Sequence, residues 1–351
     1  MSGGPGPVLG FVGIHAGKRT DQPVSQNETI ARLFAESGYR SRRTSAVKWP
    51  PLRTAHQIWC LLTWRDVDLI VIAVFSGQSF WIAEFASRLG RLTNKHIVLF
   101  LHGGNLPVFA PQHRRWVERV FGRADRIIAP SGFLADTFRE WGYDVRIIPN
   151  VLFVDDYEYL ERERARPALM WMRTFHEHYD PLMAVRVLER VARVHPDVTL
   201  TMGGADHGLL EATVAEARRL GVEDRITFPG YMSIDQKRAA FATHDVFLNT
   251  NTVDNMPVSV LEAAASGLVP VATAVGGVPD LLHDREDSLL VPAGDDEAMA
   301  EAVLTLIAEP RRFAAMSAKA RQLALHSSWP EVLELWRDEL ELILPGRDVR
   351  G

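Results

Sequence analysis

The 351-residue sequence lacks the features that mark secreted, membrane-spanning or nucleic-acid-binding proteins. Its one cysteine, Cys60, excludes an internal disulfide framework and fits a reducing compartment. The first residues lack the charged region and the apolar run of a signal peptide, so none is expected, and no run approaches the roughly eighteen apolar residues that span a bilayer. The net charge of −5 provides no basic excess for nucleic acid. We therefore expect a cytoplasmic protein, and weak contact with the inner face of a membrane stays open.

A dinucleotide-binding fingerprint is also missing. The first apolar run is followed by Gly13 and Gly17, but no G-x-G-x-x-G sequence opens a helix there. No acidic residue closes the next strand, where it would bind a ribose. Both absences argue against NAD. The polar loop from His15 to Gln26 is longer than a plain connection needs, which favours a loop that faces a substrate.

Short apolar runs alternate with amphipathic segments along the whole chain. This alternation predicts parallel sheets with helices on both faces, because strands that are buried on both sides are continuously apolar. The runs expected as strands are 8–14, 68–75, 96–102, 125–130 and 145–150 in the first half, and 168–172, 198–203, 225–230, 245–250, 268–273 and 288–292 in the second.

The predicted architecture is α/β, with two tandem Rossmann-like, doubly wound domains facing a central cleft. A chain of this length is expected to form two domains, which we assign to residues 1–154 and 168–326. The charge-rich segment 155–167 is interpreted as an interdomain linker. In such sheets ligands bind beyond the carboxyl ends of the strands, so the residues that follow each apolar run are the candidates for a site.

Residues 249–267 read NTNTVDNMPVSVLEAAASG and follow one of these strands. Pro257 and Gly267 bracket a predicted helix. The backbone amides of Val258 and Ser259, together with the helix dipole, would then form an anion site.

Two acids flank this predicted anion site. Asp254 lies before the helix, whereas Glu262 lies more than one turn inside it. Helix capping would account for Asp254, but it does not account for an acid at 262. The pattern favours a bound diphosphate with an acid on either side for the attached parts of the ligand.

The stretch resembles the GT-B fold retaining glycosyltransferases of family 4, the glycosyl transferases group 1. Their signature is Glu-x7-Glu, with LEA-x-A-x-G around the second acid and a later GG-x-P-E. The chain has Asp254-x7-Glu262, LEAAASG at 261–267 and GGVPD at 276–280. The resemblance covers nearly the whole chain, since further matches occur at 129–131, 147–150, 289–295 and 327–332.

The resemblance implies roles for individual residues. Glu262 would bind the ribose of a UDP- or GDP-linked sugar, which is a co-substrate, and no other cofactor is expected. Asp254 would contact the donor sugar. The helix within 327–351 would cross back to the first domain. The remaining residues expected around the donor are Asn255, Met256, Val258, Ser259 and Tyr231, the last with Met232 beside the base.

A second group of implied residues belongs to the first domain. His102 opens the sequence HGGN at the end of a predicted strand, where a tight turn is the simpler interpretation. By resemblance His102 would lie near the donor sugar and the acceptor, with Asn105 beside it. Gly17 would lie on the acceptor side.

The phosphate clamp departs from the family pattern. Relatives usually carry Gly-Arg after the first strand of the second domain, and a Lys about five residues later. Here Met172 replaces the Gly, Arg173 matches the Arg, and His178 falls near the Lys. Arginine suits phosphate. An imidazole is charged only near or below neutral pH, so His178, or failing that His176, would supply a conditional charge, and turnover would decline as pH rises. The alternative is a surface histidine, with Arg173 acting alone.

No metal is expected at this clamp. His176 and His178 are two clustered imidazoles without a convincing third ligand, and no Asp-x-Asp element follows a strand in the first half. The charge of the diphosphate would be neutralised by Arg173, His178 and the backbone amides of the helix.

The resemblance thus implies a retaining, metal-independent hexosyltransferase. It would move a sugar to a glycan, lipid-linked or small-molecule acceptor, in bacterial polysaccharide or glycoconjugate synthesis, with no nucleic acid as partner. Two other classes stay open: a sugar-nucleotide epimerase or phosphorylase of the same fold, and a non-catalytic sugar-nucleotide-binding module, which the altered clamp and first acid would suit.

Overall fold

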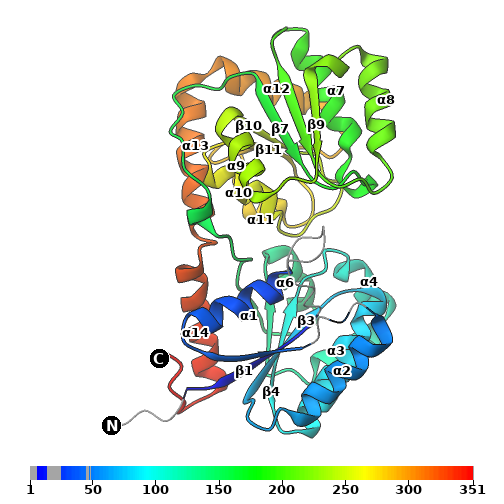
Figure 1. The fold of residues 1–351 in the computed structure, drawn as a ribbon, viewed down its shortest axis with the longest axis vertical. Coiled ribbons are helices and arrows are strands. Elements are labelled where there is room, and N and C mark those ends of the chain that lie inside the picture. Colours follow the sequence, from blue (N-terminus) through cyan, green and yellow to red (C-terminus); the bar gives the residue numbers. More distant parts are fainter. Residues whose placement is uncertain (1–5, 14–24, 45–46, 48, 351) are drawn as a thin grey trace. The chain divides into compact units, whose positions relative to one another are not determined.

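The computed structural model describes residues 6–13, 25–44, 47 and 49–350. It divides the chain into two compact units (Figure 1). The first unit combines Met1–Val151 with Trp329–Gly351, and the second is Leu152–Ser328. Within the described residues, none of the helices has the length and apolar character that a bilayer crossing requires.

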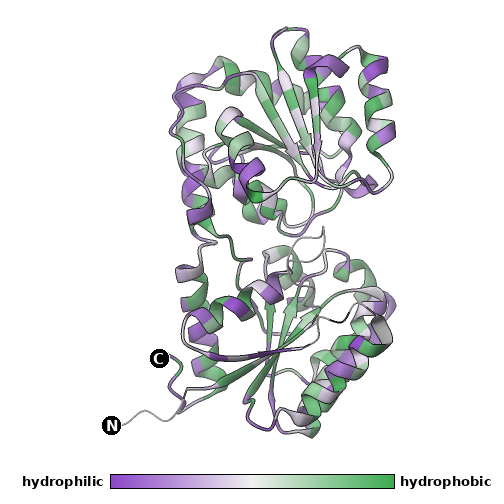
Figure 2. Ribbon diagram, viewed as in Figure 1, coloured by the Kyte–Doolittle hydropathy of each residue, from purple (hydrophilic) through white to green (hydrophobic). Residues whose placement is uncertain are grey.

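The first unit is built on one parallel six-stranded sheet. The strand order is β2-β1-β3-β4-β5-β6, so the chain changes direction across the sheet between β1 and β3. Figure 2 shows the inner strands as predominantly hydrophobic, as expected for a sheet buried on both faces. The strands are β1 (Val8–Val12), β2 (Arg40–Arg43), β3 (Leu69–Val74), β4 (His96–Leu101), β5 (Arg126–Ala129) and β6 (Val145–Ile147).

Helices cover both faces of this sheet. Side chains of Ile70, Ile72 and Leu99 pack with residues of α2, α3, α5 and α6 on one face. On the other face, Phe11 contacts Phe34 of α1. The helices that precede residue 152 are α1 (Gln26–Glu36), α2 (Pro50–Thr63), α3 (Phe80–Leu92), α4 (Leu106–Gln112), α5 (Arg114–Phe121) and α6 (Gly132–Arg139).

The last helix, α14 (Trp329–Ile343), belongs to the first unit. The ring of Trp336 lies 5.8 Å from Phe34 and 5.6 Å from Phe100, both edge-on. Trp329 donates a hydrogen bond of 2.8 Å from Nε1 to the Ser37 hydroxyl. Glu339 is buried and forms an ion pair with Arg126 at 2.6 Å. Aromatic packing and this ion pair therefore attach the C-terminal helix to the face of the sheet that carries α1.

The second unit repeats the plan. Its sheet is parallel, with the order β12-β11-β10-β7-β8-β9. The strands are β7 (Ala168–Met172), β8 (Thr199–Gly203), β9 (Ile226–Gly230), β10 (Val246–Asn249), β11 (Val269–Thr273) and β12 (Leu289–Val291). The helices are α7 (Pro181–Ala192), α8 (Leu210–Leu220), α9 (Ile234–Thr243), α10 (Val258–Ala265), α11 (Val278–Leu281), α12 (Asp296–Ala308) and α13 (Pro310–Leu325).

The two faces of β7 are buried in different cores. Leu169 and Trp171 point into a cluster with α7 and α12, while Met170 and Met172 point into a cluster with α10 and α13. Every strand that the apolar runs predicted is present, most of them one or two residues shorter than predicted. The predicted α/β class and the two doubly wound sheets are thus confirmed.

The charge-rich segment 155–167, expected as a linker, lies within the second unit. Arg162 is buried, and its Nε donates to Asp245 at 2.7 Å. The other guanidinium nitrogens of Arg162 donate to the backbone carbonyls of Leu160, Phe241, His244 and Ser266. Burial would raise the pKa of Asp245, but hydrogen bonds from Arg166 and Arg162 hold it below its usual value. The segment is packed structure because Arg162 and Arg166 both pair with Asp245 inside the unit.

We expect Arg162→Met to destabilise the second unit by about 3 kcal/mol, because a buried carboxylate and several carbonyls lose their donor. Urea unfolding measures the change. Arg164→Met is the matched control, since Arg164 is exposed in the same segment, and it should change stability by less than about 0.5 kcal/mol. Equal stabilities of the two variants would contradict this description of the segment.

Candidate functional site

The chain reverses its winding direction in the second sheet between β7 and β10, which are direct neighbours. In doubly wound sheets a ligand binds outside the carboxyl ends of the strands at such a switch point. Arg173 follows β7 directly, and the loop that carries Asp254 follows β10. The site is therefore built from these two strand ends and from α10, which begins after the second loop.

Arg173 and Asp254 form an ion pair between Nη2 and Oδ2. Their side chains are only 18% and 12% exposed. The Arg173 guanidinium also lies over the ring of Tyr179, 4.5 Å from its centroid, as a cation–π contact. Burial lowers the pKa of Arg173, yet a guanidinium keeps its proton in proteins. The family pattern gave these two residues separate roles and did not predict their contact.

The Asp254 carboxylate has two further donors. Asn251 donates from its side-chain amide to Oδ2, and the backbone N–H of Asn255 donates to Oδ1 at 2.7 Å. Asn251 is fully buried. Because both carboxylate oxygens accept hydrogen bonds, the acid is held in one orientation before a ligand arrives.

The glycines of the GGVPD motif explain how the Asp254 loop is held. The N–H of Gly277 donates to the Asp254 carbonyl at 3.0 Å. Gly276 has φ of +52°, and a Cβ there would lie 1.9 Å from the same carbonyl oxygen. Only glycine fits this approach. Gly204, which directly follows β8, plays a similar part for the backbone at Arg173, since a Cβ there would lie 1.7 Å from the carbonyl oxygen of Arg173.

The first turn of α10 offers polar groups without partners. Pro257 is the N-cap and gives no side-chain hydrogen bond to the helix amides. Ser259 is buried, and its hydroxyl has no hydrogen-bond partner in the described part of the chain. The same is true of both amide atoms of Asn249, which is fully buried at the end of β10. Free donors at a helix N-terminus suit an anion.

Glu262 lies inside α10 and is buried, with 9% of its surface exposed. It accepts a hydrogen bond of 2.7 Å from the hydroxyl of Tyr157. Lys237 of α9 reaches both of its carboxylate oxygens at 3.0 Å. Burial, followed by the neighbouring Glu262 charge, raises the pKa of Tyr157 above its usual value. Two donors thus fix an acid that the sequence singled out.

Sequence reasoning missed Tyr157 and Lys237. Tyr157 lies in the segment that was interpreted as a linker, 105 positions from its partner. Lys237 had one local signal, because Ser233 and Gln236 form a capping box that starts α9 and fixes the position of Lys237 in its first turn. That signal gives the helix, but it does not identify the acid that the lysine contacts.

His176 and His178 lie around a short 3₁₀ turn, Glu177–Tyr179, which also carries the Tyr179 ring that covers Arg173. The His178 N–H donates to Nδ1 of His176 at 3.2 Å, and the two rings are 4.7 Å apart. The His178 carbonyl accepts from the N–H of Thr252 at 2.8 Å. This contact links the turn to the Asp254 loop, so His178 lies at the same edge as Arg173.

The same turn contains a third potential metal ligand. His176, Glu177 and His178 each offer a ligand atom, and these atoms lie within 4.8 Å of one another. From the sequence, only the two histidines stood out as possible metal ligands, and Glu177 did not.

The residues expected beside the base differ in burial. Tyr231 follows β9 and is 50% exposed. Met232 is buried, and its sulfur lies so close to Gly203 that a Cβ there would be only 2.4 Å away. Met256 is buried in the core cluster with Val260, while Val258 at the start of α10 is partly exposed. Met232 and Met256 therefore both contribute to the core, while Tyr231 and Val258 stay accessible.

In the first unit, His102 follows β4, and its N–H donates to the Val74 carbonyl at 3.0 Å. Its ring packs against Phe75 and Phe100, with centroids 5.4 and 4.1 Å away. Burial lowers the pKa of His102 to about 3. Its Nε2 is buried and has no partner among the described residues. A neutral imidazole with one open nitrogen can exchange a hydrogen bond with a ligand, but it does not act as a cation at neutral pH.

The two other expected residues of the first unit contribute less. Asn105 is exposed at the N-cap of α4, and its side chain makes no capping hydrogen bond. Gly17, expected on the acceptor side, lies outside the described residues.

Two family models match the chain. The model for Glycosyltransferase Family 4 matches residues 18–156, and the model for Glycosyl transferases group 1 matches residues 166–309. The chain belongs to the group 1 glycosyltransferase family.

Solved structures show the same fold over nearly the whole chain of this group 1 glycosyltransferase. Sucrose-phosphate synthase from Thermosynechococcus elongatus aligns with a TM-score of 0.79 and 16% identity, covering 96% of this chain and 99% of its own. The Anabaena protein HepE in complex with UDP aligns with a TM-score of 0.74, 16% identity and the same coverage. The GT-B fold that the sequence motifs implied is confirmed.

Curated relatives match at low identity. A GDP-mannose-dependent α-(1-6)-phosphatidylinositol monomannoside mannosyltransferase of Mycolicibacterium smegmatis is 27% identical over 83% of this chain and 81% of the relative. A phosphatidylinositol N-acetylglucosaminyltransferase chain of Arabidopsis thaliana is 33% identical over 115 residues, which are 32% of this chain and 25% of the relative. The group 1 glycosyltransferase thus spans only a quarter of one relative and about four fifths of the other.

We expect Gly276→Ala to destabilise the second unit of this group 1 glycosyltransferase by more than about 2 kcal/mol, because a Cβ collides with the Asp254 carbonyl at a left-handed φ. Gly294→Ala is the matched control, since Gly294 has φ of +76° with nothing within 4 Å. It should cost only the backbone strain, about 1 kcal/mol. Urea unfolding curves compare the two, and similar losses would show that the close approach to Asp254 does not matter.

Proposed function

We propose that the chain transfers a sugar from a nucleotide-diphosphate sugar to an acceptor, with retention of configuration at the anomeric carbon. The observation that carries the proposal is the convergence of Arg173, the uncapped start of α10 and the fixed acid Glu262 at one switch point. Membership of the group 1 glycosyltransferases supports this interpretation of the site.

The diphosphate would lie at the start of α10. The amides of Val258 and Ser259 point out of the first turn, and Pro257 does not cap them. Arg173, at the neighbouring strand end, would add a permanent positive charge. As the sugar leaves, negative charge grows on the diphosphate, and one preorganised donor at such a position contributes on the order of 3 kcal/mol.

Donor binding would require Arg173 to change partner. Its guanidinium is paired with Asp254. A diphosphate carries more negative charge than one carboxylate and offers bidentate oxygens, so it can take Arg173 from Asp254. Asp254 would then be free to accept hydrogen bonds from the hydroxyls of the donor sugar, while Asn251 and the Asn255 amide hold it in place.

The ribose would bind at Glu262. Its carboxylate already accepts from Tyr157 and Lys237, and these donors hold it in one orientation. Carboxylate oxygens have several acceptor positions each, so ribose hydroxyls can be added without removing both donors. Tyr231, half exposed after β9, stays our candidate for the side chain beside the base.

Two donor nucleotides, GDP and UDP, are compatible with the proposal. The mycobacterial relative named above is GDP-mannose-dependent, whereas the Anabaena structure contains UDP. The side chain of His178 would lie beside the diphosphate, and the open nitrogen of His102 would serve the sugar or the acceptor. We assign no general base, because the leaving phosphate can accept the proton of the acceptor hydroxyl.

Nucleotide binding tests the proposal directly. Calorimetry with UDP and with GDP should give clear binding of one of them to the wild-type protein, with at least tenfold weaker binding to Glu262→Gln, because a neutral amide accepts poorly from the ribose hydroxyls. Glu211→Gln, an exposed acid on α8, is the matched control and should bind like wild type. Unchanged affinity in Glu262→Gln would contradict the ribose assignment, and no binding of either nucleotide would contradict the proposed function.

We also expect turnover without a divalent cation, because Arg173 and the α10 amides would neutralise the diphosphate. Prolonged treatment with EDTA should leave the rate within about twofold of the untreated enzyme. The control is the addition of Mg²⁺ or Mn²⁺ in excess of EDTA. Activity that EDTA abolishes and Mn²⁺ restores would contradict the expectation and would direct attention to the cluster of His176, Glu177 and His178.

A further inference from the structure

Helices α2 and α3 of the first unit pack side by side on one face of the sheet (Figure 1). Each exposes large apolar side chains along its length. On α2 these are Leu52, Trp59 and Leu62, and on α3 they are Trp81, Phe85 and Leu92, with exposed fractions of 41–70%. The spacing of three, four and seven residues aligns them on one stripe per helix. We call these six residues the α2–α3 apolar face.

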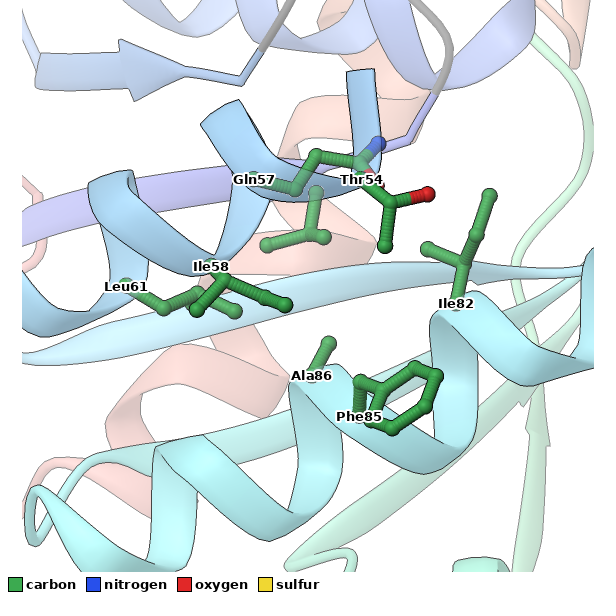
Figure 3. A pocket seen from close by; sticks show the side chains of 8 residues that line it. Thr54, Gln57, Ile58, Leu61, Ile82, Phe85 and Ala86 are labelled. Atoms are coloured by element: carbon green, nitrogen blue, oxygen red, sulfur yellow. The ribbon is translucent and has the colours of Figure 1, made fainter. Parts of the chain in front are cut away.

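Outward helix faces of this kind are normally polar, because the apolar side of a surface helix faces the core. On the sides that face the core, α2 already contributes Cys60 and Leu61, and α3 contributes Phe80, Ala83 and Ala86. The exposed stripes are therefore additional apolar surface. Between the helices lies a small pocket (Figure 3), with a mainly apolar lining of Val12, Thr54, Gln57, Ile58, Leu61, Ile82, Phe85 and Ala86.

Tryptophan is concentrated on this face. Three of the nine tryptophans are half or more exposed, namely Trp49, Trp59 and Trp81. Trp49 is the N-cap of α2, and the other two belong to the face itself. Trp81 also packs on Trp116 of α5 at 4.7 Å, which extends the aromatic surface to a third helix. Tryptophan is the residue enriched where proteins meet the interfacial region of a bilayer.

The unpaired charges on this side are positive, since Glu118 of α5 is paired with Arg114. Helix α2 contains no Asp or Glu, and the one acid of α3, Glu84, is buried and paired with Arg123 at 3.1 Å. Arg88 of α3 and Arg115 of α5 are exposed, and neither forms an ion pair with an acid in the described part of the chain. An apolar stripe bordered by unpaired arginines is complementary to a surface that is apolar inside and anionic outside.

We propose that the α2–α3 apolar face docks on the surface of an anionic bilayer, with Trp59, Trp81 and Phe85 in the interfacial layer and Arg88 and Arg115 at the headgroups. A second copy of the chain fits the face less well. A symmetric dimer would bring each patch against itself, and the unpaired arginines would then meet arginines, because the acids of α3 and α5, Glu84 and Glu118, are already paired with Arg123 and Arg114. The bilayer supplies the missing anions.

Vesicle flotation of the full chain tests this surface. We expect binding to vesicles of phosphatidylcholine with roughly one third phosphatidylglycerol, and at least tenfold weaker binding to phosphatidylcholine alone. Trp59→Ser combined with Trp81→Ser should weaken binding to the anionic vesicles by tenfold or more. Arg88→Glu combined with Arg115→Glu should do the same. Both double variants change exposed side chains and should keep the wild-type unfolding curve.

Leu342→Ser is the matched control, because Leu342 is 65% exposed on α14 and lies outside the face. It should float like wild type. Absence of wild-type binding to anionic vesicles would overturn the proposal, and so would equal binding of the wild type and the tryptophan double variant. A concentration-dependent dimer in sedimentation that the tryptophan variant abolishes, without vesicle binding, would assign the face to a second copy instead. These results do not depend on nucleotide binding, so they are independent of the proposed transferase activity.

Discussion

The ion pair between Arg173 and Asp254 is the contact on which the candidate site depends. It joins the ends of the two strands at the switch point, and both partners are largely buried. Removing one member of such a pair leaves an uncompensated charge and typically costs about 3–5 kcal/mol. The backbone on both sides is fixed as well, because Gly204 and Gly276 allow close approach to the carbonyls of the two residues. The site is therefore held in one arrangement by contacts within the unit, and we propose that a ligand enters it by taking Arg173 from Asp254.

Glu262, which lies one turn inside α10, is likewise held by contacts within the second unit. Its charge is balanced by Lys237 and oriented by Tyr157, so the second acid is also prepared before a nucleotide binds. Between the two acids lies the first turn of a helix whose N-cap leaves the backbone amides uncapped. Two paired acids and the uncapped start of a helix, all in one unit, give a consistent physical basis for binding a diphosphate with a different group at either end.

The sequence predicted the fold well and the contacts poorly. Strands such as 168–172 were found because strands buried on both faces are continuously apolar, and the Asp254–Glu262 stretch was found because strand, proline and glycine mark its helix. The Arg173–Asp254 pair, the Tyr157 hydrogen bond and the burial of Arg162 depend on tertiary packing of residues tens of positions apart, about which local patterns carry no information. The exposed apolar stripes of α2 and α3 were not predicted either, because an apolar pattern along a helix does not reveal which of its sides stays exposed to solvent.

A crystal structure of the full chain with bound UDP or GDP tests the central claim most directly. The account predicts the diphosphate at the backbone amides of Val258 and Ser259, with the Arg173 guanidinium moved from Asp254 to the phosphate oxygens and the ribose hydroxyls on Glu262. A nucleotide bound elsewhere, or one bound at α10 while Arg173 keeps Asp254 as its partner, would contradict it.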